Sequence, residues 1–123
     1  MIQGTIENGL HSRLRLKLES PTGPLDFKAL IDSGFDGQVA LPYFAADKLR
    51  LELARFVEVT YANGQSVAEV VRHGVLHWHD KLRAGEVILS DDGEPAIGTD
   101  LMQGCVVTMD FIQNVLQIDK SAA

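Results

Sequence analysis

An acidic residue stands directly behind an apolar segment at residues 29–34, where the sequence runs Ala-Leu-Ile-Asp-Ser-Gly. Residues 25–31 have the composition of a buried strand, and a carboxylate at the end of such a strand is costly unless it is paired, hydrogen-bonded or functional. This position makes Asp32 a candidate general acid or base. Asp, Ser and Gly also form ordinary β-turns, and the triplet taken alone favours a turn.

Two later segments give the Asp32 segment a context. Residues 60–67 run Thr-Tyr-Ala-Asn-Gly-Gln-Ser-Val, and residues 96–102 run Ala-Ile-Gly-Thr-Asp-Leu-Met ahead of an apolar stretch at 105–111. With residues 30–34, they resemble in sequence and order three elements of the retropepsin-like aspartic peptidases, which include the retroviral proteases and small bacterial homologues. These elements are the apolar-apolar-Asp-Thr/Ser-Gly catalytic loop, the glycine-containing flap hairpin, and a hydrophobic-hydrophobic-Gly segment with a short helix. The resemblance covers residues 2–118.

The resemblance implies an aspartic endopeptidase that hydrolyses peptide bonds of peptide or protein substrates with no metal and no cofactor. The chain holds a single Asp-Ser/Thr-Gly segment, so a second Asp32 must come from a second copy across a two-fold axis. Two carboxylates held about 3 Å apart share one proton. The charged member activates a water molecule, and the protonated member polarises the substrate carbonyl. The implied active unit is therefore a homodimer.

The resemblance also assigns roles by position. Asp32 is the catalytic acid/base, the Ser33 hydroxyl holds the two loops together, and Gly34 lets the substrate backbone come close. The residues implied to contact substrate are Phe35, Asp36, Ala62, Asn63, Gly64 and Ile97. Phe35 is either a pocket wall or part of the core, and Asp36 fits a solvated turn equally well. A pocket lined by Phe35, Leu41, Val67 and Ile97 would favour apolar side chains.

The sequence departs from the retroviral pattern at three places. Ala96 is smaller than the usual branched aliphatic residue, and the flap turn has only one glycine, Gly64. Retroviral proteases carry an arginine soon after the hydrophobic-hydrophobic-Gly segment, where it braces the catalytic loop, and Thr99 and Asp100 stand there instead. We therefore expect a loop without that brace. The alternative function is a non-catalytic dimerising or peptide-binding module that keeps the fold, because Asp32 can persist for structural reasons.

The elements that must position these residues are mostly short strands. Apolar and alternating runs predict strands at 1–6, 10–19, 25–31, 38–41, 55–61, 66–72, 75–79, 85–90, 105–111 and 115–118. Short helices are expected at 43–49 and 99–102, a two-residue hairpin turn at Asn63-Gly64, and turns at 20–24 and 91–93. The predicted class is all-β, a retropepsin-like closed barrel in one domain at residues 2–118, with a flexible tail at 119–123.

Charge and hydropathy exclude several partners. The net charge is −6, and a nucleic-acid partner would need clustered Lys and Arg. Arg13, Arg15 and Lys17 alternate with leucines, which predicts the solvated face of a strand. No apolar run has transmembrane length, and no signal peptide is recognisable. We expect a cytoplasmic protein with no nucleic-acid or membrane partner.

Histidine and cysteine residues offer weaker alternatives. His73, His77 and His79 share parity on a predicted strand, but zinc needs a third or fourth ligand, for which Asp80 or Glu69 stays open. We expect no metal site and a polar strand face instead, with Trp78 turned into the core. Cys105 is the only cysteine, so no internal disulfide can form, and its apolar surroundings predict a buried small side chain.

Overall fold

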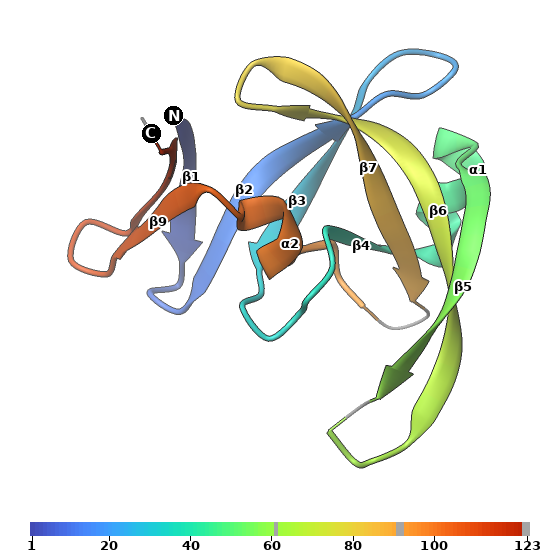
Figure 1. Ribbon diagram of the computed structural model, residues 1–123. Coiled ribbons are helices and arrows are strands. Elements are labelled where there is room, and N and C mark those ends of the chain that lie inside the picture. Colours follow the sequence, from blue (N-terminus) through green and yellow to red (C-terminus); the bar gives the residue numbers. More distant parts are fainter. Residues whose placement is uncertain (61, 91–92, 122–123) are drawn as a thin grey trace.

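The computed structural model of the chain describes residues 1–60, 62–90 and 93–121 (Figure 1). Within these residues ten strands form one sheet, together with two short helices. The strands are β1 (Ile2–Glu7), β2 (His11–Leu18), β3 (Leu25–Ile31), β4 (Val39–Pro42), β5 (Glu52–Thr60), β6 (Ser66–Trp78), β7 (Lys81–Ser90), β8 (Ala96–Ile97), β9 (Cys105–Asp110) and β10 (Val115–Lys120). The helices are α1 (Tyr43–Leu49) and α2 (Thr99–Met102). The expected all-β class with short helices is confirmed.

The strand pairings close on themselves. The order β6-β7-β4-β8-β3-β2 is joined back to β6 by a pairing of Leu18 with Leu76. The result is a ring of strands around one core, as the expected closed arrangement requires. Strands β1, β10 and β9 extend the sheet from β2 to one side, and β5 extends it beyond β6.

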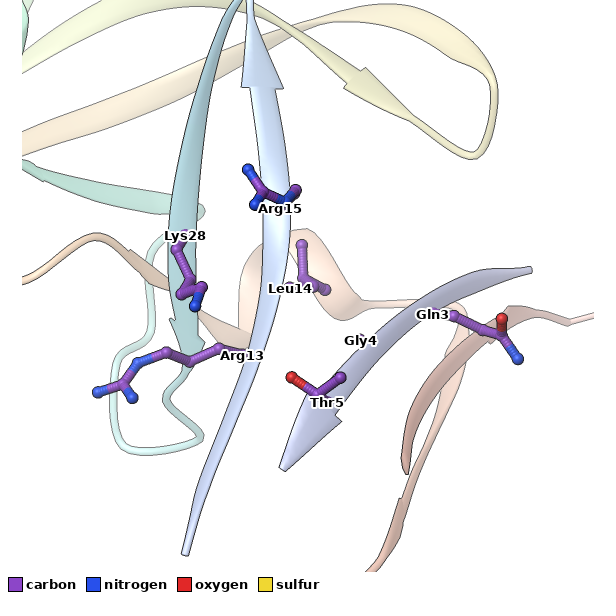
Figure 2. A pocket seen from close by; sticks show the side chains of 7 residues that line it. All are labelled: Gln3, Gly4, Thr5, Arg13, Leu14, Arg15 and Lys28. Atoms are coloured by element: carbon purple, nitrogen blue, oxygen red, sulfur yellow. The ribbon is translucent and has the colours of Figure 1, made fainter. Parts of the chain in front are cut away.

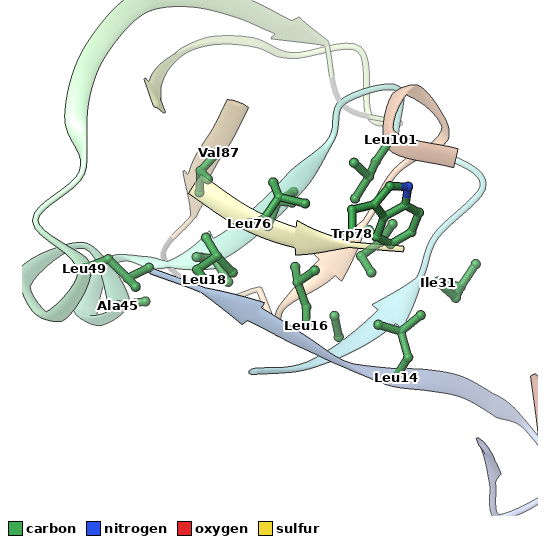
Figure 3. Packing of buried hydrophobic residues seen from close by; sticks show 14 of the residues in the cluster. Leu14, Leu16, Leu18, Ile31, Ala45, Leu49, Leu76, Trp78, Val87 and Leu101 are labelled. Carbon is green, nitrogen blue, oxygen red and sulfur yellow. The ribbon is translucent and has the colours of Figure 1, made fainter. Parts of the chain in front are cut away.

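Alternation along β2 explains how the core is filled. Leu14, Leu16 and Leu18 are almost fully buried, while the residues between them face outward, since successive side chains of a strand point to opposite faces. Figure 3 shows these leucines meeting side chains from several other elements. Prominent members of this cluster are Ile31, Ala45, Leu49, Leu76, Trp78, Val87 and Leu101. The predicted inward position of Trp78 is thus correct.

The long β6 strand differs from the prediction. The sequence predicts a break near Gly74, but β6 runs unbroken for 13 residues. A side chain at position 74 would lie 3.1 Å from the Leu51 side chain, so the glycine reflects close packing and not a turn. The last pair of the hairpin that β6 forms with β5 is Thr60 with Ser66, so the predicted two-residue turn at Asn63-Gly64 is not formed.

Smaller differences concern the element ends. β10 continues to Lys120, which pairs with Cys105 of β9, two residues beyond the predicted end of this strand. The predicted strand end at Tyr61, the turn residues Asp91 and Asp92, and the last two residues of the predicted tail lie outside the described residues. Among the described residues, neither helix has the length and apolar character that crossing a membrane requires.

Truncating the leucine that closes the ring tests the core. Leu18→Ala removes a side chain that is 0% exposed, and we expect the free energy of unfolding to fall by about 2–5 kcal/mol, the usual cost of such a cavity. Leu82→Ala is the matched control, because Leu82 is 60% exposed. Urea denaturation of both variants measures the difference, and equal small losses would show that Leu18 does not close the core.

Candidate active site

Asp32 directly follows β3, a strand in which more exposed and more buried residues alternate and not the buried strand that its composition predicts. Ile31 is buried, whereas Asp32, Ser33 and Gly34 are exposed. The Asp32 carboxylate accepts a hydrogen bond at Oδ1 from the N–H of Gly34, at 3.0 Å. The Asp32 carbonyl accepts a second from the N–H of Phe35, at 3.2 Å. These bonds fold the segment into a tight loop that holds the carboxylate at the surface.

The short strand β8 holds this loop from below. β8 is parallel to β3 on one side and antiparallel to β4 on the other, so it lies between the two ends of the loop. The N–H of Asp32 donates to the Ile97 carbonyl at 3.0 Å, and the N–H of Leu30 donates to the Pro95 carbonyl at 2.8 Å. The backbone on both sides of the catalytic candidate is therefore fixed by residues some 65 positions further along the chain.

The residues after β8 complete the support. The N–H of Gly98 donates to the Gln38 carbonyl at 3.0 Å, and the N–H of Thr99 donates to the Phe35 carbonyl at 2.8 Å. The Thr99 hydroxyl donates to the same carbonyl at 3.3 Å. A Cβ atom at position 98 would lie 2.2 Å from the Gly37 carbonyl oxygen. This close approach of two backbone segments explains the glycine.

Gln38 and Asp100 provide a brace that the sequence did not reveal. The Gln38 side-chain amide donates to an Asp100 carboxylate oxygen at 2.9 Å. Its carbonyl oxygen accepts from the N–H of Glu86 on β7, also at 2.9 Å. The loop lacks the retroviral arginine, and this different set of polar contacts connects it to α2 and β7. No sequence motif marks Gln38, whose partners lie 48 and 62 positions away.

A further feature missed from the sequence is an apolar groove beside the loop. The groove has a volume of about 530 Å³. Its walls come from the end of β3, the Asp32 loop, α2 and β9, namely Ile31, Ser33, Thr99, Met102, Cys105, Val107 and Met109. The alternating Cys105, Val107 and Met109 could have indicated one apolar strand face, but the position of β9 next to Ser33 is a consequence of the tertiary fold.

The hairpin predicted as a flap projects beyond the ring of strands. In Figure 1 its tip and the loop between β3 and β4 lie at the same, lower end of the molecule. Ala62, Asn63 and Gly64 are exposed at this tip. The Asn63 side chain accepts from the N–H of Gln65 at 2.9 Å, and Gly64 has φ +85°. Among the described residues, no hydrogen bond or ion pair joins this tip to the Asp32 loop.

The apolar pocket expected from the sequence is not formed. Ile97 is 0% and Leu41 is 1% exposed, so both side chains belong to the core and neither offers a surface to a substrate. Ile97 instead contributes the backbone carbonyl that binds Asp32. Phe35 is half-buried with its ring over Gly37, and Asp36 is exposed.

Only two of the three histidines, His73 and His77, lie on β6 with the same parity. His77 lies on β6 and its ring nitrogen is 2.5 Å from a Glu19 carboxylate oxygen. His79 lies in the turn after β6 with φ +51°, and its Nε2 is 3.6 Å from the Cys105 sulfur. Cys105 is half-buried, so the prediction that its side chain is buried is wrong. In the described part of the chain, no three His, Cys, Asp or Glu side chains are grouped so that they could hold a metal ion.

Solved structures show which fold this is. A retropepsin-like aspartic protease from Rickettsia conorii superimposes with a TM-score of 0.66 at 14% sequence identity, covering 98% of this chain and 89% of that one. EIAV protease complexed with the inhibitor HBY-793 gives 0.60 at 14% identity, covering 80% and 91%. The retroviral protease-like domain of Ddi1 from Leishmania major gives 0.50 at 17% identity, covering 87% and 88%.

These similarities show that the chain has the retropepsin-like fold, as the resemblance in sequence implied. No protein-family model and no curated protein sequence matches the chain.

Removing the Gln38 brace should loosen the loop. Gln38→Leu leaves the Glu86 N–H and the Asp100 carboxylate without these partners, so we expect about 1–3 kcal/mol lower stability and displaced amide resonances at Asp32 and Gly34. Gln113→Leu in an exposed turn is the control. Denaturant unfolding and NMR spectra of the two variants provide the measurement, and indistinguishable spectra at the loop would disprove the bracing role.

His79 should titrate at unusually low pH. Burial lowers the pKa of its ring below the ordinary 6.5, and the positive N-terminus and Lys120 act in the same direction against Asp119 and Asp80. The unfolded chain then binds the proton more readily than the folded chain. Stability due to His79 is therefore present above pH 6.5 and falls as the pH drops from there through the folded-state pKa.

NMR titration of the imidazole protons measures this pKa directly, and thermal unfolding between about pH 5 and about pH 7.5 gives the stability. We expect His79→Gln to lose less stability on acidification than the parent. A ring that titrates at or above 6.5 would contradict the prediction.

Proposed function

We propose that the chain is an aspartic endopeptidase whose active site forms when two copies pair and each contributes Asp32. The observation that carries the proposal is the loop at the end of β3, in which an exposed carboxylate is fixed by Gly34 and by the Ile97 carbonyl. A group that must act on a substrate needs this combination of solvent access and fixed position. The retropepsin-like fold supports the same assignment.

The edge of the sheet supports the homodimer. β9 is the last strand of the sheet in the described residues and pairs only with β10, so its outer edge is free to pair with another strand. Exposed apolar side chains lie on β9 and in the turn that follows it: Val106 (60%), Phe111 (57%) and Ile112 (94%). The turn is held by Asp110, which accepts hydrogen bonds from the N–H groups of Ile112 and Gln113.

Antiparallel pairing of two β9 edges across a two-fold axis would also fill the groove beside Ser33. In such a pair the end of one strand lies against the start of the other, so the Phe111–Ile112 turn of one copy comes to the Met102 and Cys105 end of its partner's groove. The same contact brings the two Ser33 residues and the two Asp32 loops toward the axis. Dimerisation and assembly of the site then become one event.

The chemistry follows from two Asp32 carboxylates that share one proton. The ionised carboxylate takes a proton from a water molecule, and the oxygen of that water attacks the carbonyl carbon of the substrate. The protonated carboxyl donates to the carbonyl oxygen. The tetrahedral intermediate collapses as the amide nitrogen is protonated and the C–N bond breaks, which releases an amine and a carboxylic acid.

The β5–β6 hairpin would cover the bound substrate. A peptide lying as an extended strand over the Asp32 loops can form main-chain hydrogen bonds with the hairpin tip at Ala62, Asn63 and Gly64. Exposed Asp36 and half-buried Phe35 flank Asp32 and would contact the substrate next to the cleaved bond. Closure over the peptide excludes water from the carboxylate pair.

Concentration dependence of hydrolysis tests the proposal. A mixed peptide library is incubated from about pH 4 to about pH 7, the range that a shared-proton carboxylate pair favours. We expect the parent's activity to rise faster than linearly with protein concentration. Asp32→Asn should lower the activity by at least about a hundredfold. Asp26→Asn, which changes an exposed carboxylate on β3, the strand that precedes Asp32, should leave the activity unchanged.

Val106→Asp provides a second test, since it places charge on the free β9 edge. We expect a monomer by sedimentation and loss of activity, with Leu82→Asp as a control of equal exposure. A dimer that binds peptides without cleaving them would indicate the alternative, a non-catalytic binding module. Undiminished cleavage by Asp32→Asn would refute the catalytic assignment.

A further inference from the structure

A hollow of about 360 Å³ lies between β1 and β2, away from the Asp32 loop (Figure 2). It exists because β1 changes partner: residues 5–7 of β1 pair with β2, while residues 2–5 pair with β10. Beyond the pair formed by Thr5 and Arg13 the two strands diverge, as Figure 2 shows. Gly4 lies at this point, where a Cβ would be 2.3 Å from the Arg13 carbonyl oxygen.

Three cationic side chains surround this hollow: Arg13, Arg15 and Lys28. Arg13 and Arg15 are two residues apart on β2 and so share a face. Lys28 of β3 is directly opposite Arg15, and Figure 2 shows the two side chains on neighbouring strands. Like charges directly opposite in a sheet are destabilising. The pair of Arg15 and Lys28 therefore does not stabilise the fold.

The neighbouring acids neutralise the other cations but not Arg15. Arg13 Nη2 donates to both Glu94 carboxylate oxygens, at 3.1 and 2.8 Å. Glu7 accepts from Lys28 at 3.2 Å and from Arg13 at 3.5 Å. The Arg15 side chain makes no hydrogen bond or ion pair with any other residue that the structure describes.

The cationic neighbours of Glu7 favour its charged form. The hydrogen bond from Lys28 lowers the pKa of Glu7, with further lowering by the charges of Lys28 and Arg13 against desolvation, so Glu7 stays ionised and stays paired. Three cations then face two acids and one positive charge is left over, in a chain whose net charge is −6. Lys17, the next cation on the same face of β2, lies directly opposite Asp26 and has no such excess.

We propose that this hollow binds a small ligand through an oxyanion, a phosphate or a carboxylate group, held by the Arg15 guanidinium and the Lys28 ammonium. A guanidinium can donate two parallel hydrogen bonds to one oxyanion, and an ammonium adds a point charge. The Thr5 hydroxyl, which Figure 2 shows directed toward β2, supplies a neutral donor on the adjoining wall. A bound anion also removes the repulsion between the two opposed cations. The site does not depend on the proposed peptidase activity.

NMR titration of the full chain tests this inference. Inorganic phosphate and acetate are added separately at constant ionic strength, held with sodium chloride, so that screening of surface charges stays fixed. We expect saturable shifts of the Gly4, Thr5 and Arg15 amides with at least one of the two anions. Saturation with phosphate alone identifies a phosphate ligand, and saturation with acetate alone identifies a carboxylate.

Variants distinguish binding at this hollow from a general attraction of anions to positive surface charge. Arg15→Gln should weaken the binding at least about tenfold, because it removes charge-assisted hydrogen bonds, and Lys28→Gln should weaken it in the same direction. Lys17→Gln, a matched change on the same strand face, should leave the affinity unchanged. The spectra themselves report whether each variant is folded. Shifts that never saturate, or equal responses of Arg15→Gln and Lys17→Gln, would overturn the proposal.

Discussion

The backbone hydrogen bonds between the Asp32 loop and the segment around β8 are the constraint on which the site depends. Asp32, Gln38 and Phe35 are each bound by Ile97, Gly98 or Thr99 through main-chain groups. Because these partners are far apart in sequence, the loop can take its shape only after the ring of strands has closed. The ring in turn is filled by side chains from β2, β6, β7 and the helices, so the position of one carboxylate rests on the packing of the whole core.

Polar side chains add further contacts to the backbone hydrogen bonds that hold the Asp32 loop. Gln38 connects the loop both to Asp100 in α2 and to Glu86 on β7, and Thr99 adds a hydroxyl to the Phe35 carbonyl. The charge of an arginine is therefore not needed to brace a loop of this shape, since a neutral amide with both a donor and an acceptor joins the same elements. The apolar groove beside Ser33 borders this support, since Thr99 also lines the groove.

Patterns local in sequence were predictable, and contacts between distant segments were not. Alternation in β2, the apolar run of β3 and the exact limits of α1 and α2 follow from spacing and propensity. The break predicted at Gly74 was wrong because the sequence does not distinguish a glycine needed for close packing against Leu51 from a glycine that ends a strand. The contact between Cys105 and His79 could not be predicted, because His79 comes from a turn 26 positions away. Ile97 was expected to contact the substrate. Whether its side chain or its backbone faces the Asp32 loop depends on how β8 is oriented in the sheet, which the sequence does not show.

The continuity of β6 has a mechanical consequence. This strand of 13 residues spans roughly 40 Å at about 3.3 Å per residue, and it belongs both to the projecting hairpin and to the ring. No loop or domain boundary separates the two parts, so the hairpin moves as a twisted ribbon clamped at one end and not as a lid on a hinge. Its softest point is the irregularity on β5 between Leu53 and Arg55, where the register shifts. Bending there strains β6, the strand that also carries Leu76 and pairs through it with β2 and β7, so the ring would supply the force that opposes the bending.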